Sequence, residues 1–320
     1  MALRMRRILV AIGDWHRPPR AQLRKAVELA RLYNARVELF HALTFPFGNS
    51  VPTGTAALYA ASHLEALTKR AQQRLGSLAK SPLLADLQVT THVTSDYPIH
   101  EAIIRRAMST SVDLVVIGIH RHSAAARLFL TNTDWELIRQ CPCPLLLVKS
   151  TRRYARSAVL TAVDPFHTHA KPANLDTRLL QAGAEIARQV QASLHLFHAY
   201  LPWVNLVPMP GAPFPIDPSP EVEAAHRQLI LGKLSPLAKR FGITPRATHL
   251  SMGPVPEELA ATVRRIHAAM VVMGAVSRSA LRRLFIGHTA EAVLDKLPCD
   301  ILLIKPKTFR TTVSLRGSKQ

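Results

Sequence analysis

The chain has 320 residues, of which 48% are hydrophobic and 19% are charged. This composition predicts a folded protein of about two domains and excludes a disordered chain. Lysine and arginine number 41 against 21 acidic residues, so the formal net charge is +20. A protein of this charge attracts polyanions such as nucleic acid or nucleotides.

A membrane protein or a secreted protein is not expected. No apolar run reaches the roughly 18 residues that a membrane-spanning helix needs. The segment Met1–Asp14 carries basic residues but lacks the apolar core and the small-residue cleavage site of a signal peptide. We therefore expect a cytoplasmic protein with no membrane partner.

Short aliphatic runs alternate along the first half with stretches whose apolar residues recur every three or four positions. The short runs predict strands near Ile8–Ile12, Val37–His41, Leu87–Val93, Leu114–Gly118 and Leu145–Val148. The periodic stretches predict helices over Leu23–Tyr33, Ala56–Ala79, Ile99–Met108 and Trp135–Gln140. Continuously apolar strands indicate a parallel sheet that helices cover on both faces. Right-handed crossovers then favour a doubly wound, flavodoxin-like sheet of five strands with the first strand central.

The second half repeats the first, and the order of the matching segments is kept. The matches pair Ile8–Asp14 with Ala158–Asp164, Ala35–Leu43 with Ala192–Tyr200, Asp113–Gly118 with Ala269–Gly274, and Leu128–Lys149 with Leu284–Lys305. A period of this length indicates a duplicated domain rather than a solenoid. We predict domain 1 over residues 1–150 and domain 2 over residues 157–307. The polar, basic segment Ser150–Ser157 is the predicted linker.

The fifth strand of each half is short, apolar and last in its sheet. Such strands, PLLLV at 144–148 and DILLI at 300–304, leave exposed edges that associate unless they are covered. We expect the halves to pair through these two strands as a pseudo-dimer within one chain. A further homodimer between chains is left open.

Catalytic and metal-binding motifs are absent. The chain has no Walker loop, nucleophile elbow or HExxH helix, so we predict no catalytic residue and expect no enzyme. The cysteines lack zinc or thioredoxin spacing and are expected to be buried thiols: Cys141, Cys143 and Cys299. Two histidine pairs would bind zinc only with a third ligand from elsewhere, and no metal site is expected there: His120 with His122, and His167 with His169.

The second half carries a candidate anion site. Ligands of open α/β sheets bind at the carboxyl ends of the strands, where the strand order reverses. The candidate residues there are Asp164 after the first strand, Gly274, Ser277 and Arg278 after the fourth, and Gly287, His288 and Thr289 at the start of the last helix. A glycine permits close approach of the backbone, and free N–H groups at a helix start favour anions. The structural alternative is that Gly287 fits a tight turn and Thr289 caps the helix.

The first half departs from this pattern. Thr131 stands where the second half has Gly287, so its Cβ hinders close approach. The Asp134 carboxylate in the first helical turn repels a phosphate. Thr133 and Glu136 have the spacing of a capping box, in which side chains satisfy the helix start. We therefore interpret these residues of the first half as structural.

The aspartate after the first strand, the glycine motif after the fourth and the final CP-x-LLV strand resemble the universal stress protein family. The resemblance covers almost the whole chain twice, as in tandem members. It implies an adenine nucleotide alpha hydrolase-like fold and a cytoplasmic, non-enzymatic protein that supports resistance to DNA damage and other stress.

The resemblance also implies an ATP site in domain 2, with magnesium bound only through the nucleotide. Asp164 would approach the base and ribose. The residues around the phosphates would be Gly274, Ser277, Gly287, His288 and Thr289. Ser277 and His288 depart from the family pattern, which has glycine and serine at these positions. In the first half Arg121 and Thr131 replace glycines, so no nucleotide is expected there.

Two further hypotheses remain open. The basic surface is suited to nucleic acid, although the chain shows no helix-turn-helix, zinc-finger or RRM signature. The proline-rich, apolar segment Leu201–Pro220 is either a rigid loop or a lid over a cavity for an apolar ligand.

Overall fold

The computed structural model describes residues 4–14, 20–44, 55–119, 130–166, 174–202, 219–275 and 288–315. The chain forms two compact units. The first unit contains residues 4–151 together with the C-terminal segment 307–315. The second unit contains residues 152–306. A hydrogen bond from the Thr312 hydroxyl to the Gln140 side-chain oxygen, at 2.8 Å, ties the C-terminal segment to the first unit.

The first unit is a parallel sheet with helices between its strands. Its strands are β1 (Arg7–Ala11), β2 (Arg36–Leu43), β3 (Val89–Ser95), β4 (Leu114–Gly118) and β5 (Leu145–Val148). Its helices are α1 (Arg20–Tyr33), α2 (Thr55–Ala79), α3 (Ile99–Ser109) and α4 (Asn132–Gln140). The strand order is β3-β2-β1-β4-β5.

The second unit repeats this arrangement with the order β10-β9-β6-β7-β8. Its strands are β6 (Ala158–Ala162), β7 (Ser193–Tyr200), β8 (Thr248–Met252), β9 (Ala268–Gly274) and β10 (Asp300–Ile304). Its helices are α5 (Leu175–Gln189), α6 (Pro220–Arg240), α7 (Val255–Arg265) and α8 (His288–Lys296), with a 3-10 turn, η2, at Pro245–Ala247.

The predicted fold class is confirmed: each half is a doubly wound parallel sheet of five strands with its first strand central. The order differs from that of flavodoxin in one respect, because β3 lies outside β2 and not beside β1. The hydrophobic pattern shows which strands are buried. It does not show whether the third strand pairs with the first strand or with the second. The reversal of strand order falls between β1 and β4, and between β6 and β9.

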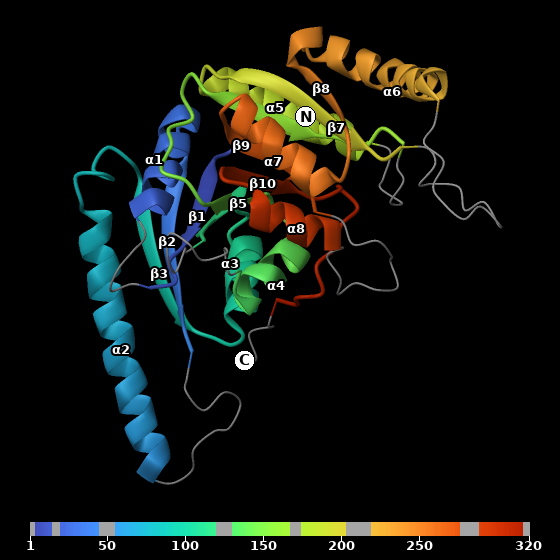
Figure 1. Ribbon diagram of the computed structural model, residues 1–320. Coiled ribbons are helices and arrows are strands. Elements are labelled where there is room, and N and C mark those ends of the chain that lie inside the picture. Colours follow the sequence, from blue (N-terminus) through green and yellow to red (C-terminus); the bar gives the residue numbers. More distant parts are fainter. Residues whose placement is uncertain are drawn as a thin grey trace, which may run out of the picture. The chain divides into compact units, whose positions relative to one another are not determined.

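The helices of each unit are divided between the two faces of its sheet, as right-handed crossovers require. In the first unit α3 packs against α4, and in the second α7 packs against α8. Figure 1 shows α7 and α8 on the same face of their sheet, with α5 on the other face. Most residues of β1, β4 and β9 are buried, and several of their side chains are almost fully excluded from solvent.

The predicted linker has a structural role that its polar composition does not indicate. Tyr154 is fully buried in the second unit, and its hydroxyl donates a 2.6 Å hydrogen bond to the carboxylate of buried Asp300. Residues on both sides of Tyr154 are exposed. This single side chain therefore anchors the segment that leads into β6.

Two smaller features complete the fold. Among the described residues, no helix is long and apolar enough to span a membrane. The cysteines form no disulfide; Cys141 and Cys299 are buried as predicted, but Cys143 is only half-buried. The prediction was wrong for Cys143, which is partly exposed before β5, whereas Cys299 at the equivalent position before β10 is buried.

Candidate functional site

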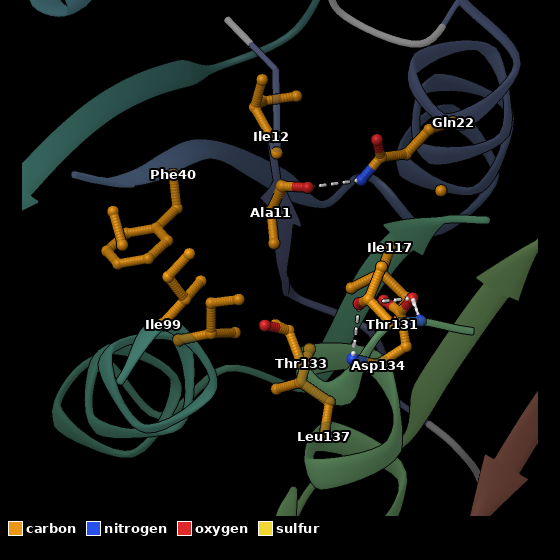
Figure 2. A pocket seen from close by; sticks show the side chains of 14 residues that line it. Ala11, Ile12, Gln22, Phe40, Ile99, Ile117, Thr131, Thr133, Asp134 and Leu137 are labelled. Atoms are coloured by element: carbon orange, nitrogen blue, oxygen red, sulfur yellow. Dashed lines mark hydrogen bonds between the residues drawn. The ribbon is translucent and has the colours of Figure 1, made fainter. Parts of the chain in front are cut away.

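A cavity of about 300 Å³ lies in the first unit where the strand order reverses. Its walls come from the ends of β1, β2 and β4 and from α3 and α4 (Figure 2). Most of the lining is aliphatic or aromatic, and includes Phe40, Ile99, Ile103, Ile117 and Leu137. Polar groups reach it mainly from the start of α4. A cavity of this size and lining is suited to a small ligand.

The start of α4 is occupied by its own side chains. Thr131 is the N-cap, and its hydroxyl accepts a hydrogen bond from the Asp134 backbone N–H at 3.2 Å. The Asp134 carboxylate accepts from the Thr131 N–H at 2.8 Å and from its hydroxyl at 2.9 Å. Figure 2 shows this reciprocal pair at one side of the cavity, with Thr133 beside it. An anion would meet a carboxylate here and not a set of free N–H groups.

The predicted capping box was therefore misplaced by two residues. The sequence favoured Thr133 with Glu136, whereas the structure uses Thr131 with Asp134. The helix starts two residues earlier because Asp134 at the third helical position can bond back to Thr131. Glu136 is instead paired with Arg139 at 2.8 Å. The conclusion that the helix start is satisfied by side chains is confirmed.

Gln22 on α1 holds β1 and β4 together beside the cavity, and the sequence pattern did not single it out. It is fully buried, and its side-chain amide donates to the carbonyl oxygens of Ala11 and Val116, both at 2.8 Å. Figure 2 shows the first of these bonds. The periodicity of α1 gave no signal for Gln22, because a polar residue on the buried face only interrupts the apolar pattern of the helix.

A pair of equivalent histidines supports the same region in both units. His41 Nδ1 donates to the carbonyl of Ile12 at 2.7 Å, and His198 Nδ1 donates to the carbonyl of Val163 at 3.0 Å. Both rings are buried. The repeated Phe-His-Ala tripeptide was the sequence signal for these residues, which fix the chain as it leaves the first strand of each unit.

The second unit's reversal point is described only in part. Asp164 lies just beyond β6, is half-buried and accepts a hydrogen bond from the Phe166 N–H at 3.3 Å. Gly274 ends β9, and a Cβ there would lie 3.0 Å from the Leu175 side chain. His288 and Thr289 begin α8. The predicted residues Ser277, Arg278 and Gly287 lie outside the described residues, as do both histidine pairs considered for zinc.

Charged residues that the sequence interpretation missed gather beside Gly274. Ala275 N–H donates to the carbonyl of Ile304 at 3.2 Å, so the ends of β9 and β10 adjoin. Lys305 follows β10 and is buried, and the guanidinium of Arg178 donates to its carbonyl at 2.5 Å. Burial lowers the pKa of Arg178. The Arg178 guanidinium and the backbone of Lys305 thus lie close to the strand end from which the predicted phosphate residues follow.

A buried carboxylate is also present at this end of the second unit. Asp176, in the first turn of α5, accepts a hydrogen bond from the Asp164 N–H at 3.2 Å. The bond holds the backbone at Asp164 against the helix start. Its sequence signal was weak, since an acidic residue in a first helical turn is common.

The proline-rich segment has anchored ends, although its central part, 203–218, lies outside the described residues. The Tyr200 hydroxyl at the end of β7 donates to Glu223 of α6 at 2.6 Å. His226 meets the Tyr200 ring edge to face. The hypothesis of a lid stays a prediction.

Comparison with known proteins identifies the family. The model of the universal stress protein family matches the chain twice, at residues 5–149 and 159–305. The chain belongs to the universal stress protein family. Its two matches make it a tandem member with one family domain in each half.

Several relatives align with almost the whole of this chain. Universal stress protein E from Escherichia coli K12 is 28% identical over 315 residues, which cover 96% of each chain. Among solved structures, a functionally unknown protein from Pseudomonas aeruginosa PAO1 aligns with a TM-score of 0.69 at 24% identity, covering 95% of this chain and 94% of that one. A universal stress protein from Archaeoglobus fulgidus aligns at 0.59 and 13% identity, covering 93% and 98%. The relatives support a stress-response role, and the structures support the fold.

Proposed function

We propose that this universal stress protein acts in stress resistance by binding a nucleotide, ATP with its magnesium ion, in the second unit and not in the first. One contrast carries the proposal. Asp134 closes the start of α4 with a carboxylate, whereas the equivalent position in α8 is Ala290. A helix start without that carboxylate keeps its N–H groups available to phosphate.

The proposed contacts are those that the sequence pattern of the second unit indicates. Asp164 approaches the base and ribose. The phosphates are held by Gly274, Ser277, Arg278, Gly287, His288 and Thr289. Arg178 fits this use, because its guanidinium brings positive charge to the end of β10 beside Gly274. The occupancy of such a site would rise and fall with the concentration of ATP in the cell.

The proposed role is one of binding without catalysis. Neither the sequence motifs nor the geometry described above provides a nucleophile with an adjacent base, or a group that orients water. We propose that the bound nucleotide sets the conformation or the partner choice of a cytoplasmic protein that protects against stress such as DNA damage.

The test is calorimetric titration of the purified chain with ATP and magnesium. We expect saturable binding at one site per chain. Gly287→Glu and Ala290→Asp should each weaken binding at least tenfold, because each places a carboxylate at the phosphate position. Gly76→Glu on α2 of the first unit is the matched control and should bind as the wild type does, since nothing lies within 4 Å of a Cβ there.

Absence of heat and of thermal stabilisation at millimolar ATP would contradict the proposal. So would two equal sites per chain, or unchanged affinity in both variants. Because an acidic residue in the first turn favours a helix, Ala290→Asp is expected to fold normally, which separates loss of binding from loss of structure.

A further inference from the structure

Exposed arginines gather at the edge of the second sheet where its strands begin. Arg153 and Arg156 precede β6, Arg246 precedes β8, and Arg264 and Arg265 precede β9. All five side chains are exposed. This edge lies opposite the carboxyl ends of the strands, so the arginines are separate from the proposed nucleotide site.

The parallel topology brings these arginines together. The strands that they precede lie in the order β9-β6-β7-β8, with a spacing of about 4.8 Å, so the row spans roughly 15 Å. Hydrogen bonds link the turns along this edge. Arg152 donates to the His267 carbonyl at 2.9 Å, and the Ser193 N–H donates to the Ser157 carbonyl at 3.0 Å.

The charge of this edge is not cancelled by nearby carboxylates. Within the described part of the chain, none of the five arginines forms an ion pair. Of the carboxylates close to this edge, Glu185 is bonded to Arg188 and Asp300 is buried against Tyr154.

Arg265 is oriented by neutral groups. Its guanidinium lies 3.4 Å from His249 Nδ1 and 3.4 Å from the Thr262 hydroxyl. Neutral acceptors of this kind hold the side chain without cancelling its charge. A partly ordered arginine also loses less conformational entropy when it binds an anion.

Helix dipoles explain only part of the pattern. Arg264 and Arg265 occupy the last turn of α7, where a cation is favourable. Arg153 and Arg156 belong to no helix, and Arg246 lies in a single 3-10 turn. Five acidic residues of this unit lie in first helical turns at the opposite edge: Asp176, Glu221, Glu223, Glu257 and Glu258. These five acidic residues are therefore separated from the arginines by the length of the strands.

We propose that this arginine edge, defined by Arg153, Arg156, Arg246, Arg264 and Arg265, binds the phosphate backbone of nucleic acid. A row of about 15 Å faces several phosphates of one strand, which a single small anion would not occupy. A membrane-binding surface would add large apolar side chains to the basic ones. The exposed large hydrophobic residues of the described chain lie elsewhere: Leu32, Leu58, Tyr59, Tyr97, Leu201, Val222, Leu229, Met252 and Leu315.

The test is fluorescence anisotropy of the full chain with a labelled single-stranded 24-nucleotide DNA at 50, 100 and 200 mM salt. The edge variant is Arg153→Glu/Arg246→Glu/Arg264→Glu, whose three side chains make no hydrogen bond within the described structure. The control variant Lys69→Glu/Arg70→Glu/Arg74→Glu changes the net charge by the same amount on the exposed face of α2.

We expect the wild type to bind with an affinity that falls steeply with salt. The edge variant should bind at least tenfold more weakly, and its salt slope should be smaller by about 2, which corresponds to three lost phosphate contacts on a single strand. The control should lose less than threefold. If the glutamate variant fails to fold, the corresponding glutamine variant replaces it. It should also bind the DNA more weakly than the control does.

Three results would overturn the proposal. The wild type would fail to bind at 50 mM salt, the control would lose as much affinity as the edge variant, or the protein would bind vesicles of anionic lipid and not the oligonucleotide. The edge variant leaves the carboxyl ends of the strands unchanged, so it should bind ATP as the wild type does. Titrating it with ATP therefore tests the proposed nucleotide site separately from the arginine edge.

Discussion

Asp134 determines what the start of α4 offers to a ligand. Its carboxylate accepts two hydrogen bonds from Thr131, and its own N–H donates back to the Thr131 hydroxyl. The sequence indicated a closed helix start but placed the box at Thr133. Both threonines have an acidic residue three positions later, so spacing alone could not distinguish them.

His249 makes the stability of the second unit sensitive to pH. Its ring stacks on His195, with Nε2 2.9 Å from His195 Nδ1. Burial, followed by the charges of His195 and Arg265, lowers the pKa of His249 to about 4. The unfolded chain binds this proton at a higher pH than the folded one, so folding stability is lost as pH falls from about 6.5 towards about 4.

His249→Gln should therefore flatten the dependence of the unfolding midpoint on pH between about 6.5 and about 4. Thermal unfolding at several pH values measures this. His63→Gln, at an exposed position of α2, is the control and should leave the wild-type slope unchanged. An equal slope in His249→Gln and wild type would show that the pair does not govern the acid response.

At the level of elements, the two units differ in the residues that pack their first helix against their first strand. Gly183 of α5 faces β6, and a Cβ there would lie 2.3 Å from the Thr161 hydroxyl. The equivalent residues of the first unit are Ala26 and Ala11, both buried. A small residue on the helix accompanies a larger one on the strand in the second unit, and two alanines fill the same space in the first.

Gly183→Ala should lower the free energy of unfolding by about 1–3 kcal/mol, because the added methyl group meets Thr161 in a close-packed core. Adding Thr161→Ala should recover most of this loss, since the pair then matches the first unit and alanine favours the helix over glycine. Urea denaturation of the two single variants and the double variant gives the coupling energy. A Gly183→Ala variant as stable as the wild type would refute the close contact.

The strands could be predicted well from the sequence because burial on both faces leaves a continuous apolar run. For β4 and β5, the predicted and observed bounds are Leu114–Gly118 and Leu145–Val148. The sequence could not predict whether β3 pairs with β2 or with β1, since both arrangements bury the same residues. The role of Tyr154 was missed because one aromatic residue in a basic segment carries no periodicity.

The candidate site could be predicted only in outline. The position of the site follows from the topology alone, because it lies where the strand order reverses. The glycine motif indicates which residues of the second unit would form it. Arg178 and Lys305 escaped notice because their position depends on the adjacency of β9 and β10, not on sequence spacing.

At the scale of the whole molecule, duplication has produced two units with one fold and different sites. The first unit has a carboxylate at its helix start, and the second has alanine at the same position. The pairing of the halves through β5 and β10 stays a proposal, argued from the short apolar edges that these strands would otherwise expose. We propose that only the second unit binds a nucleotide.

The most direct test of this assignment is photoaffinity labelling of the full chain with an azido analogue of ATP, followed by mass-spectrometric mapping of the labelled peptides. We predict that the label falls within residues 157–305 and is competed away by ATP. Competed label confined to residues 4–151 would contradict the account, because it would place the nucleotide beside Asp134.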